Sequence, residues 1–523
     1  MQMGGLGDII RRNARRFPDK IAYMSDTQRI TFSQFNDRIN RLYSYLRKKG
    51  LGEGDRVAIL SYTRPEYMEV FGVAEKGGLI TVPVNWRLKG EELAYQFNDS
   101  GAKVLIVQLP FVETIRDIRS KIGVEHYICI GDKPAGMENY DEVIKRNQPV
   151  EPEVEIRDND VVYIIYTSGT TGKPNGAMIT HGGQRECSRS MAIEVGIRRV
   201  EKHLEGMMLF HIGPRSFLFP IFHRGCTNYL VERFDPKRFF EIIEKERITT
   251  TELVPTQIAM MLDLPDQEKY DTSSLYTIFY AAMPMPVAVL RRGIERFGRV
   301  FVQGFGQTET GPLITCFCRE YHNPYGDEKD IKRLSSCGQP GIDVDVMIVD
   351  DKGSELGPNE TGEIMAKHVW LMKGYWNKPE LTAQTMENGW VHTGDMGYMD
   401  EDGFLYIVDR KKDMIISGGE NIYPREIEEV LYQHPAVREA TVIGVPSEKW
   451  GEDVKAFIAL KTGLVTTEEE IIEFCRDKLA SFKKPKSVEF LDELPKTGSG
   501  KIYKKVLRDK YWQGIGRKVI KDN

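Results

Sequence analysis

The feature of this sequence that most constrains its fold is a regular alternation of amphipathic segments and short apolar runs over residues 31–108. Thr31 and Gln34 form a capping-box pattern ahead of an apolar stripe that ends at Gly50, which predicts a helix. The runs "RVAIL", "LITVPV" and "KVLIVQ" that follow are typical of buried strands, and the segments between them are typical of helices. Because strands that alternate with helices form parallel sheets through right-handed crossovers, the sequence predicts an α/β protein.

The pattern of predicted helices and strands changes twice further along the chain. The alternation continues to about residue 300, and from there to about residue 408 short β-rich pieces such as "DVDVMIVD" and "GEIMAK" lie between Gly, Pro and Asn turns. Residues 409–424 then join a dense charge cluster to a glycine pair, and a compact α+β pattern follows, with a helix capped by Thr467 and Glu470. We therefore expect a large α/β domain closed by a β subdomain, then a hinge, then a small α+β domain.

Composition excludes several classes of protein. A length of 523 residues, with 41% hydrophobic and 28% charged residues, is typical of a globular protein of several domains, and a net charge of −5 argues against a nucleic-acid binder. The seven cysteines lack C-x-x-C spacing, which argues against a disulfide framework and a zinc site and fits a reducing compartment. The sequence has no run of about 18 apolar residues and no signal-like start, so we expect no membrane span and a cytoplasmic protein.

A loop of Ser, Thr and Gly around one lysine, "YTSGTTGKPNG" at residues 166–176, follows the apolar run "VVYIIY". Backbone amides and hydroxyls in such a turn can surround an anion while Lys173 supplies a positive charge, which is the chemistry of phosphate binding. The loop fits neither the Walker A pattern nor the G-x-G-x-x-G fingerprint. Taken alone, it could equally be a surface connection.

Four further stretches combine charged side chains with glycines in a way that packing does not explain. They are "QGFGQTETGP" (303–312), "VHTGDMGYMD" (391–400), "DRKKDMIISGGENIYP" (409–424) and "LPKTGSGKIYK" (494–504). Polar contacts to a nucleotide would require such residues. In this order, and together with the loop at 166–176, the stretches resemble the AMP-forming adenylating superfamily of acyl-CoA synthetases, luciferases and peptide-synthetase adenylation domains.

This resemblance implies a domain organisation. The large N-terminal domain, residues 1–411, would consist of two doubly wound α/β subdomains and a β subdomain. The small, mobile α+β C-terminal domain, residues 412–523, would hinge at Lys412.

The resemblance also implies which residues bind ATP. The phosphate loop would hold the β- and γ-phosphates with Thr167, Ser168, Gly169, Thr170, Thr171, Gly172 and Lys173. The stretch "YAAMPMP" would enclose the adenine with Ala281, Ala282 and Met283, at positions where the family often has glycines.

Five more residues complete the nucleotide site on the same basis. Phe305, where the family usually has tyrosine, would stack on the adenine, and Thr308 would contact the α-phosphate. Glu309 would hold Mg²⁺ through its carboxylate. Asp395 and Arg410 would bind the ribose hydroxyls.

One position departs from the family pattern. Asn175 stands where the family usually has a second lysine, so a positive charge at the far end of the phosphate loop is missing, although Lys173 remains. This departure raises the alternative that the fold only binds its ligands without catalysis. Against that alternative stand Glu309, Asp395, Arg410 and Lys501.

The resemblance implies a reaction in two halves that uses MgATP, a carboxylic acid and coenzyme A. Lys501 in "PKTGSGK" would stabilise the charge that builds up when the carboxylate attacks the α-phosphorus and pyrophosphate leaves. The small domain would then rotate, with Gly418 and Gly419 lining the path of the pantetheine arm, and the thiol would displace AMP. An adenylating enzyme with an acceptor other than CoA remains an alternative.

The resemblance implies an acid pocket with His211 at its mouth, Gly304 at an open floor and Ala281 at its border. These residues favour a medium-chain, cyclic or aromatic monocarboxylate over acetate. Arg215 and His223 are alternative second anchors for a dicarboxylate, although a place in the core or on the surface is favoured for both. The absence of an aspartate near residue 210 argues against an amino-acid substrate, a luciferase would share these motifs, and a homodimer is an open alternative.

Overall fold

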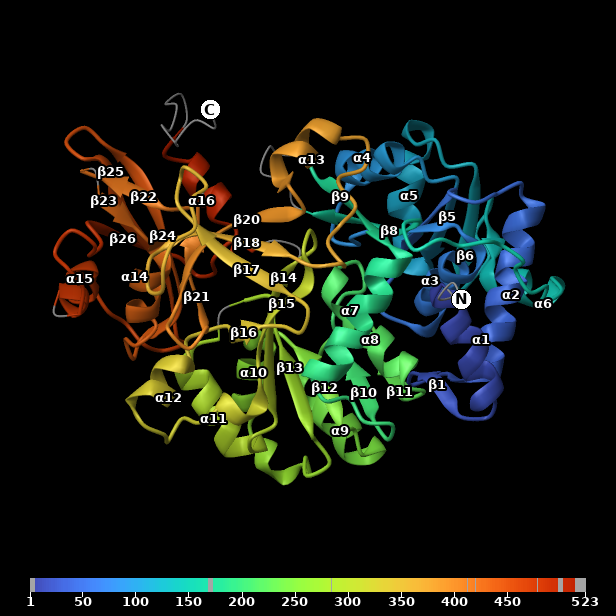
Figure 1. The fold of residues 1–523 in the computed structure, drawn as a ribbon, viewed down its shortest axis with the longest axis horizontal. Helices are drawn as coiled ribbons and strands as arrows, with labels where there is room; N and C mark the ends of the chain where they lie inside the picture. The colour runs from blue at the N-terminus through green and yellow to red at the C-terminus, as the bar shows by residue number, and fades with distance from the viewer. Residues whose placement is uncertain are drawn as a thin grey trace. The chain divides into compact units, whose positions relative to one another are not determined.

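The computed structural model describes residues 5–167, 173–283, 285–411, 413–418, 420–476, 478–496 and 502–512. The chain divides into two compact units (Figure 1): the first holds residues 1–346 and 366–392, and the second holds residues 347–365 and 393–523. Among the helices in the described ranges, none is both long and apolar enough to cross a membrane. No disulfide joins the seven cysteines, all of which lie within these ranges.

The first unit contains a seven-stranded sheet in the order β7-β6-β5-β3-β4-β8-β9. Its strands are β3 (Arg56–Leu60), β4 (Ile80–Pro83), β5 (Val104–Gln108), β6 (His126–Ile130), β7 (Glu138–Asn139), β8 (Val161–Thr167) and β9 (Asn175–Thr180). Neighbouring strands are parallel throughout, except that β9 runs antiparallel to β8. The predicted parallel sheet is therefore confirmed.

The helices of this region begin where the sequence indicates. In α2 (Phe32–Lys48), Gln34 N donates to Thr31 Oγ1 at 3.2 Å, and Thr31 N donates to Gln34 Oε1 at 2.9 Å, so the predicted capping box is present. The next helix, α3 (Pro65–Gly77), starts with a proline, whose missing N–H is tolerated in a first turn. The other helices of this region are α1 (Leu6–Arg16), α4 (Gly90–Ser100), α5 (Val112–Ile118) and α6 (Tyr140–Arg146).

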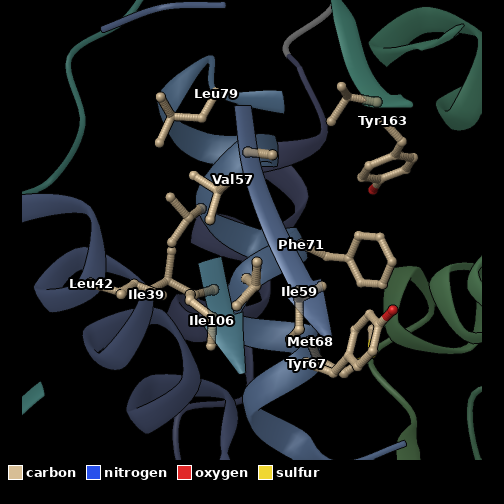
Figure 2. Close-up of a cluster of buried hydrophobic side chains, with 14 of the residues drawn as sticks. Ile39, Leu42, Val57, Ile59, Tyr67, Met68, Phe71, Leu79, Ile106 and Tyr163 are labelled. Carbon is tan, nitrogen blue, oxygen red and sulfur yellow. The ribbon is translucent and has the colours of Figure 1, made fainter. Parts of the chain in front are cut away.

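Both faces of the seven-stranded sheet are covered by apolar side chains. On one face Val57 and Ile59 pack beneath α2 and α3 in the cluster of Figure 2. On the other face Ala58 and Leu60 pack against α4 and α5. Because alternate residues of a strand point to opposite faces, a strand buried on both faces must be apolar throughout, as "RVAIL" is after its first residue. This is the doubly wound arrangement that the resemblance implied.

A nine-stranded sheet follows in the order β16-β15-β14-β13-β12-β10-β11-β1-β2. Its strands are β1 (Ile21–Met24), β2 (Arg29–Thr31), β10 (Lys202–Glu205), β11 (Thr227–Leu230), β12 (Thr250–Leu253), β13 (Thr277–Tyr280), β14 (Phe301–Gln307), β15 (Gly311–Phe317) and β16 (Gln339–Pro340). Helices α7 (His181–Glu194), α8 (Ile212–His223), α9 (Pro236–Glu246), α10 (Pro255–Leu262) and α11 (Val287–Phe297) alternate with these strands. Strand β1, from the N-terminal segment, pairs in parallel with β11, a pairing that sequence analysis did not predict.

From residue 345 onward the predicted β-rich region forms a third sheet in the order β17-β18-β20-β19, with β21 paired to β20. The first strands of the predicted region, β14, β15 and β16, belong instead to the nine-stranded sheet. Its strands are β17 (Asp345–Val349), β18 (Gly362–Lys367), β19 (Met386–Glu387), β20 (Trp390–Met399) and β21 (Leu405–Arg410). The pieces "DVDVMIVD" and "GEIMAK" thus contain strands, as predicted. Two short helices, α12 (Glu328–Arg333) and α13 (Pro379–Thr385), also belong to this part of the chain.

The C-terminal part of the second unit has its own sheet and core. The sheet order is β23-β22-β25-β24, with β26 parallel to β25, and the helices are α14 (Pro424–Leu431), α15 (Glu468–Arg476) and α16 (Lys504–Asp509). The strands are β22 (Ile415–Ser417), β23 (Glu420–Ile422), β24 (Val437–Ser447), β25 (Gly451–Leu460) and β26 (Ser487–Phe490). Before α15, Thr467 and Glu470 form the predicted cap through hydrogen bonds of 3.0 and 3.2 Å. The boundary at residue 411 and the hinge stay predictions, and Lys412 lies outside the described residues.

Candidate active site

A tight hairpin between β14 and β15 carries the predicted catalytic residues Thr308 and Glu309. The Gln307 N–H donates to Thr310 Oγ1 at 3.0 Å and closes the turn. Gly311 adopts a positive φ of 70°, and a Cβ atom there would lie 2.8 Å from Trp370 Cδ1, so only glycine fits. The backbone of this hairpin therefore fixes the position from which the Glu309 side chain extends.

The Glu309 carboxylate receives hydrogen bonds from two hydroxyl groups. Thr167 Oγ1 donates to Glu309 Oε1 at 3.2 Å, and Tyr375 Oη donates to the same oxygen at 2.8 Å. Burial, and after it the negative charge of Glu309, raise the pKa of Tyr375 above its ordinary value, so the tyrosine stays a donor. The structure thus brings the end of β8 to the hairpin. The rest of the predicted phosphate loop, residues 168–172, lies outside the described residues.

Sequence analysis missed Tyr375, which lies on a segment that extends the sheet beside β9. Met178 N donates to Gly374 O at 2.9 Å, and Trp376 N donates to Gly176 O at 2.7 Å. Ala177 and Tyr375 form an antiparallel bridge between these bonds. The signal for this segment was present in the stretch "GYWNKPE" (374–380), where a glycine and two aromatic residues precede a lysine and a proline.

The end of the phosphate loop is described from Lys173 onward. Lys173 is exposed, and its Nζ lies 5.3 Å from the centre of the Tyr95 ring. Asn175 is buried at the start of β9, opposite Thr167. Lys378 Nζ donates to Asn175 Oδ1 at 2.6 Å. A lysine from a distant part of the chain therefore contacts the residue that departs from the family pattern.

The predicted adenine-binding residues follow β13. Ala282 has a φ of 71°, in the left-handed region that costs a residue with a side chain about 1–2 kcal/mol. This is a position where the family often has glycine, and strained backbone of this kind clusters at functional sites. Ala281 and Phe305 both pack at the edge of one apolar cluster, so the structure brings these two predicted residues into one region. Met283, two residues after Ala281, is half-buried.

The predicted acid-binding residues are placed differently from one another. His211 occupies the N-cap position of α8 without a capping hydrogen bond from its side chain, and its ring centre lies 4.4 Å from that of Phe210. A Cβ atom at Gly304 would lie 2.4 Å from Cζ of Phe279, so the expected open floor is filled on that side by this ring. A small cavity between α7, α8 and β15 lies next to Gly311, and its lining residues are Ile179, Gly183, Gln184, Cys187, Ile212, Ser216, Gly311, Pro312 and Trp370.

The alternative anchors for a dicarboxylate both have partners within the protein. Arg215 is 1% exposed, pairs with Glu75 and donates to Tyr163 Oη at 3.2 Å, and burial lowers its pKa to about 10. Burial lowers the pKa of His223 to about 4, so this imidazole is neutral near pH 7, and its Nδ1 lies 3.2 Å from Ser188 Oγ. The favoured interpretation of Arg215 as a core residue is confirmed.

In the second unit, the predicted ribose-binding residues are cross-strand partners. Asp395 on β20 is paired in register with Arg410 on β21, and Arg410 Nε lies 2.5 Å from Asp395 Oδ1. The Asp395 side chain is buried, whereas the Arg410 side chain is 42% exposed. The structure therefore brings the two residues together, with the guanidinium facing solvent in part.

Ion pairs join helix α16, in the segment after residue 501, to Glu428 of α14 and to Asp413 in the same unit. Lys504 Nζ lies 2.9 Å from Glu428 Oε1, and Arg508 pairs with Asp413. Burial raises the pKa of the nearby Asp409 to about 6, although Lys504 opposes the shift.

The residues on either side of Lys501 are held in place within this unit. Lys496 and Ile502 form an antiparallel bridge, and Tyr503 N donates to Pro495 O at 2.7 Å. Lys501 itself and Gly419 lie outside the described residues.

Gly418 is described and adjoins an exposed tryptophan that sequence analysis did not single out. Gly418 has a φ of 61°, and its N–H donates to Trp450 O at 2.8 Å. A Cβ atom at this glycine would lie 2.9 Å from Cε3 of Trp450, whose side chain is exposed. The backbone here therefore requires glycine for both conformation and space.

Comparison with known proteins identifies relatives along nearly the whole chain. The profile of a family described as AMP-binding enzyme matches residues 10–376, and that of the AMP-binding enzyme C-terminal domain matches residues 426–501. The chain is 36% identical over 516 residues to feruloyl-CoA synthase from an Amycolatopsis species, which covers 98% of this chain and 100% of that protein. It is 34% identical over 520 residues to a long-chain-fatty-acid–CoA ligase of Mycobacterium tuberculosis, with 97% and 99% covered.

A solved structure is similar to this chain over the same extent. An anthranilate CoA ligase in complex with anthranoyl-AMP superposes with a TM-score of 0.88 at 29% identity, and the match covers 97% of each chain.

Proposed function

Because this chain belongs to the family of AMP-binding enzymes, we propose that it is a carboxylate–CoA ligase, which uses ATP to form an acyl-adenylate and then an acyl-CoA thioester. The observation that carries the proposal is the meeting of Thr167, at the start of the phosphate loop, with the Glu309 carboxylate. Feruloyl-CoA synthase and the fatty-acid–CoA ligase, named for this reaction class, are similar over nearly the full chain.

In the first half-reaction, a carboxylate oxygen of the acid attacks the α-phosphorus of ATP, and the bond to pyrophosphate breaks. Thr167, Lys173 and the loop residues Ser168, Gly169, Thr170, Thr171 and Gly172 bind the β- and γ-phosphates, and Thr308 contacts the α-phosphate. Lys501 stabilises the charge that builds up on the phosphoryl oxygens. Ala281, Ala282, Met283 and Phe305 hold the adenine, and Asp395 and Arg410 hold the ribose.

Glu309 fits the role of a Mg²⁺ ligand. Its carboxylate accepts hydroxyl hydrogen bonds at Oε1 and is only half-buried, and carboxylate oxygens are among the ligands that Mg²⁺ prefers. When bound, the ion would neutralise charge on the phosphates. Thr167 and Tyr375 orient the carboxylate by their hydrogen bonds.

In the second half-reaction, the CoA thiol attacks the carbonyl carbon of the acyl-adenylate, AMP leaves and the thioester forms. Residues 412–523 rotate about Lys412 between the halves, so that Lys501 leaves and Gly418 and Gly419 line the path of the pantetheine arm. Support for this role of Gly418 is the absence of space for a side chain beside Trp450.

The substrate that we propose is an aromatic, cyclic or medium-chain monocarboxylate, bound near His211, Gly304 and Ala281. Arg215 is already paired with Glu75 and His223 is neutral, so neither offers a second anchor for a dicarboxylate. The relatives named for feruloyl and anthranilate substrates support an aromatic acid.

The decisive experiment measures release of pyrophosphate and AMP by the purified protein with MgATP. Each acid of a panel (aromatic, alicyclic, aliphatic of graded length, and dicarboxylic) is supplied with and without CoA. We expect CoA-dependent turnover with aromatic or medium-chain acids and none with dicarboxylic acids. Lys501→Ala should abolish pyrophosphate release while it spares thioester formation from a supplied acyl-adenylate.

Two results would contradict the proposal. Pyrophosphate release that is indifferent to CoA would indicate a different acceptor for the acyl group. No release with any acid, in a protein that still binds MgATP, would indicate a binding protein without catalysis.

A further inference from the structure

Lys378 is distant in sequence from the predicted phosphate loop, yet its side chain contacts the C-terminal end of that loop. Lys378 Nζ donates to Asn175 Oδ1 at 2.6 Å, to Tyr95 Oη at 3.2 Å and to Pro174 O at 3.3 Å. Asn175 is the residue at which the family usually has a second lysine. The charge that the loop sequence lacks is therefore present in space, on a residue 203 positions further along the chain.

The three acceptors of Lys378 are neutral. An amide oxygen, a carbonyl oxygen and a phenol oxygen take up its three N–H groups, and within the described ranges no carboxylate pairs with it. Lys504, by comparison, is paired with Glu428 at 2.9 Å. The Asp99 carboxylate accepts from Tyr95 Oη at 3.3 Å, so it lies one hydroxyl away from the Lys378 ammonium and does not contact it directly. The positive charge of Lys378 is therefore offset only in part and remains available to an anion.

Lys378 and Lys173 are close to the same aromatic ring. Lys173 Nζ lies 5.3 Å and Lys378 Nζ lies 5.9 Å from the centre of the Tyr95 ring, which is on α4. Each ammonium is attracted to the ring, but the two ammonium groups repel each other. A polyanion that binds beside both would relieve this repulsion, and a triphosphate carries the required charge.

The backbone around Lys378 is held by hydrogen bonds to other parts of the chain. Trp376 Nε1 donates to Asp99 O at 3.0 Å, and Trp376 N donates to Gly176 O at 2.7 Å. Lys378 O accepts from Thr382 N at 3.0 Å at the start of α13. The side chain therefore extends from an anchored position, which lowers the entropy cost of holding it at the loop.

We propose that Lys378 is a positioning residue for ATP: it supplies the positive charge that Asn175 does not, and it holds the Lys173–Asn175 end of the phosphate loop. The inference rests on the proposed function, because the ligand of the loop is taken to be ATP. On this proposal, Lys378 takes the place of the lysine that the family usually has at position 175, so Asn175 does not leave the site short of a positive charge.

The test is the dissociation constant of MgATP, measured by calorimetry without any acid, and the KM for ATP in pyrophosphate release. Lys378→Met should raise both by about tenfold, a loss typical of one half-exposed cation, and leave the KM for the acid unchanged. Lys378→Arg should stay close to wild type. The matched control is Lys373→Met, which removes an exposed ammonium that, among the described residues, donates to Asn159 O at 3.0 Å, and it should change neither quantity.

The exchange variant N175K/K378N returns the lysine to the loop and should restore MgATP binding to within about threefold of wild type. The ratio between Lys378→Met and wild type should also shrink at high salt, because partly exposed charges are screened.

Two results would overturn the inference: MgATP binding by Lys378→Met within twofold of wild type, or a loss that the exchange variant does not recover and that salt does not change. A wild type that binds MgATP but releases no pyrophosphate contradicts the proposed function alone, since the binding comparison still decides the role of Lys378.

Discussion

The charged residues of the predicted nucleotide site in the first unit differ in their partners from those around Lys504 in the second unit. Glu309 accepts from the hydroxyls of Thr167 and Tyr375, and Lys378 donates to neutral oxygens only. In the second unit Lys504 pairs with Glu428. A charged group whose partners are neutral can still attract a ligand of opposite charge, whereas two opposite charges in contact largely cancel each other's electrostatic field. The partner of a charged residue, more than its type, therefore separates ligand sites from structural ion pairs.

Asp395 and Arg410 lie between these two cases. They pair with each other at 2.5 Å, as structural ions do, yet the arginine remains 42% exposed. Their proposed role at the ribose requires that each keeps hydrogen-bonding capacity beyond the pair, which a carboxylate and a five-donor guanidinium can do.

The largest effect that the comparison predicts is on Glu309. Glu309→Gln keeps the shape and the hydrogen bonds but removes the charge, so the rate of adenylate formation should fall by about 100-fold or more. The measurement is kcat/KM for pyrophosphate release at saturating MgATP. The midpoint of thermal unfolding should stay near that of wild type, because hydroxyl donors can also bond an amide oxygen. A large loss of stability with normal turnover would place Glu309 among the structural charges.

The next largest effect concerns Lys504, whose side chain is 16% exposed. Lys504→Met leaves Glu428 without its ion-pair partner and should lower the free energy of unfolding by about 2–4 kcal/mol, close to the cost of breaking a buried pair. Denaturant unfolding of the second unit would measure this loss. The matched control is Lys505→Met, which breaks an exposed pair with Asp509 and should cost no more than about 0.5 kcal/mol. Equal losses in the two variants would refute the assignment of Lys504 as a structural ion.

A smaller effect is expected at Tyr375. Tyr375→Phe removes one hydrogen bond to the Glu309 carboxylate and should reduce kcat/KM for adenylate formation by about 10- to 100-fold, since a hydrogen bond to a charged group contributes about 1.5–3 kcal/mol. In the double variant with Glu309→Gln, the effect of Tyr375→Phe should largely disappear. Additive losses would show that Tyr375 acts independently of the carboxylate.

The smallest effect is the pH dependence that Asp409 contributes. Burial raises its pKa in the folded protein to about 6, above that of the unfolded chain, so the folded state takes up the proton first as pH falls. Relative to Asp409→Asn, wild type should therefore gain about 1 kcal/mol of unfolding free energy between pH 7 and pH 5. Paired unfolding curves at the two pH values measure this gain. A gain of the opposite sign would mean that Lys504 outweighs burial.

Local patterns predicted much of the fold. The capping box at Thr31 and the run "RVAIL" depend on residues close in sequence, and both were predicted correctly. The pairing of β1 with β11 joins segments some two hundred residues apart, such as Tyr23 with Asn228, and no local pattern encodes it.

The same reason explains what sequence analysis missed at the site. Glu309 and Thr167 were identified from their motifs, but the partner Tyr375 lies on another segment and reaches them through backbone bonds to β9. Arg215 is typical of an anion anchor by residue type, and only the position of Glu75, 140 residues away, reveals it as a core ion. Charge can be read from a sequence, whereas the cancellation of charge depends on three-dimensional contacts.

The extension of the sheet by residues 373–376 limits how this protein can be recombined. Tyr375 pairs with Ala177, and Lys378 donates to Asn175. The loop and this distant segment therefore have to be exchanged together when parts of the chain are recombined with those of a relative. A chimaera that imports a relative's loop with its second lysine would place two ammonium groups at one position unless residues 373–378 are exchanged as well. A deletion of one residue there would turn Tyr375 to the opposite face, because successive residues of a strand alternate.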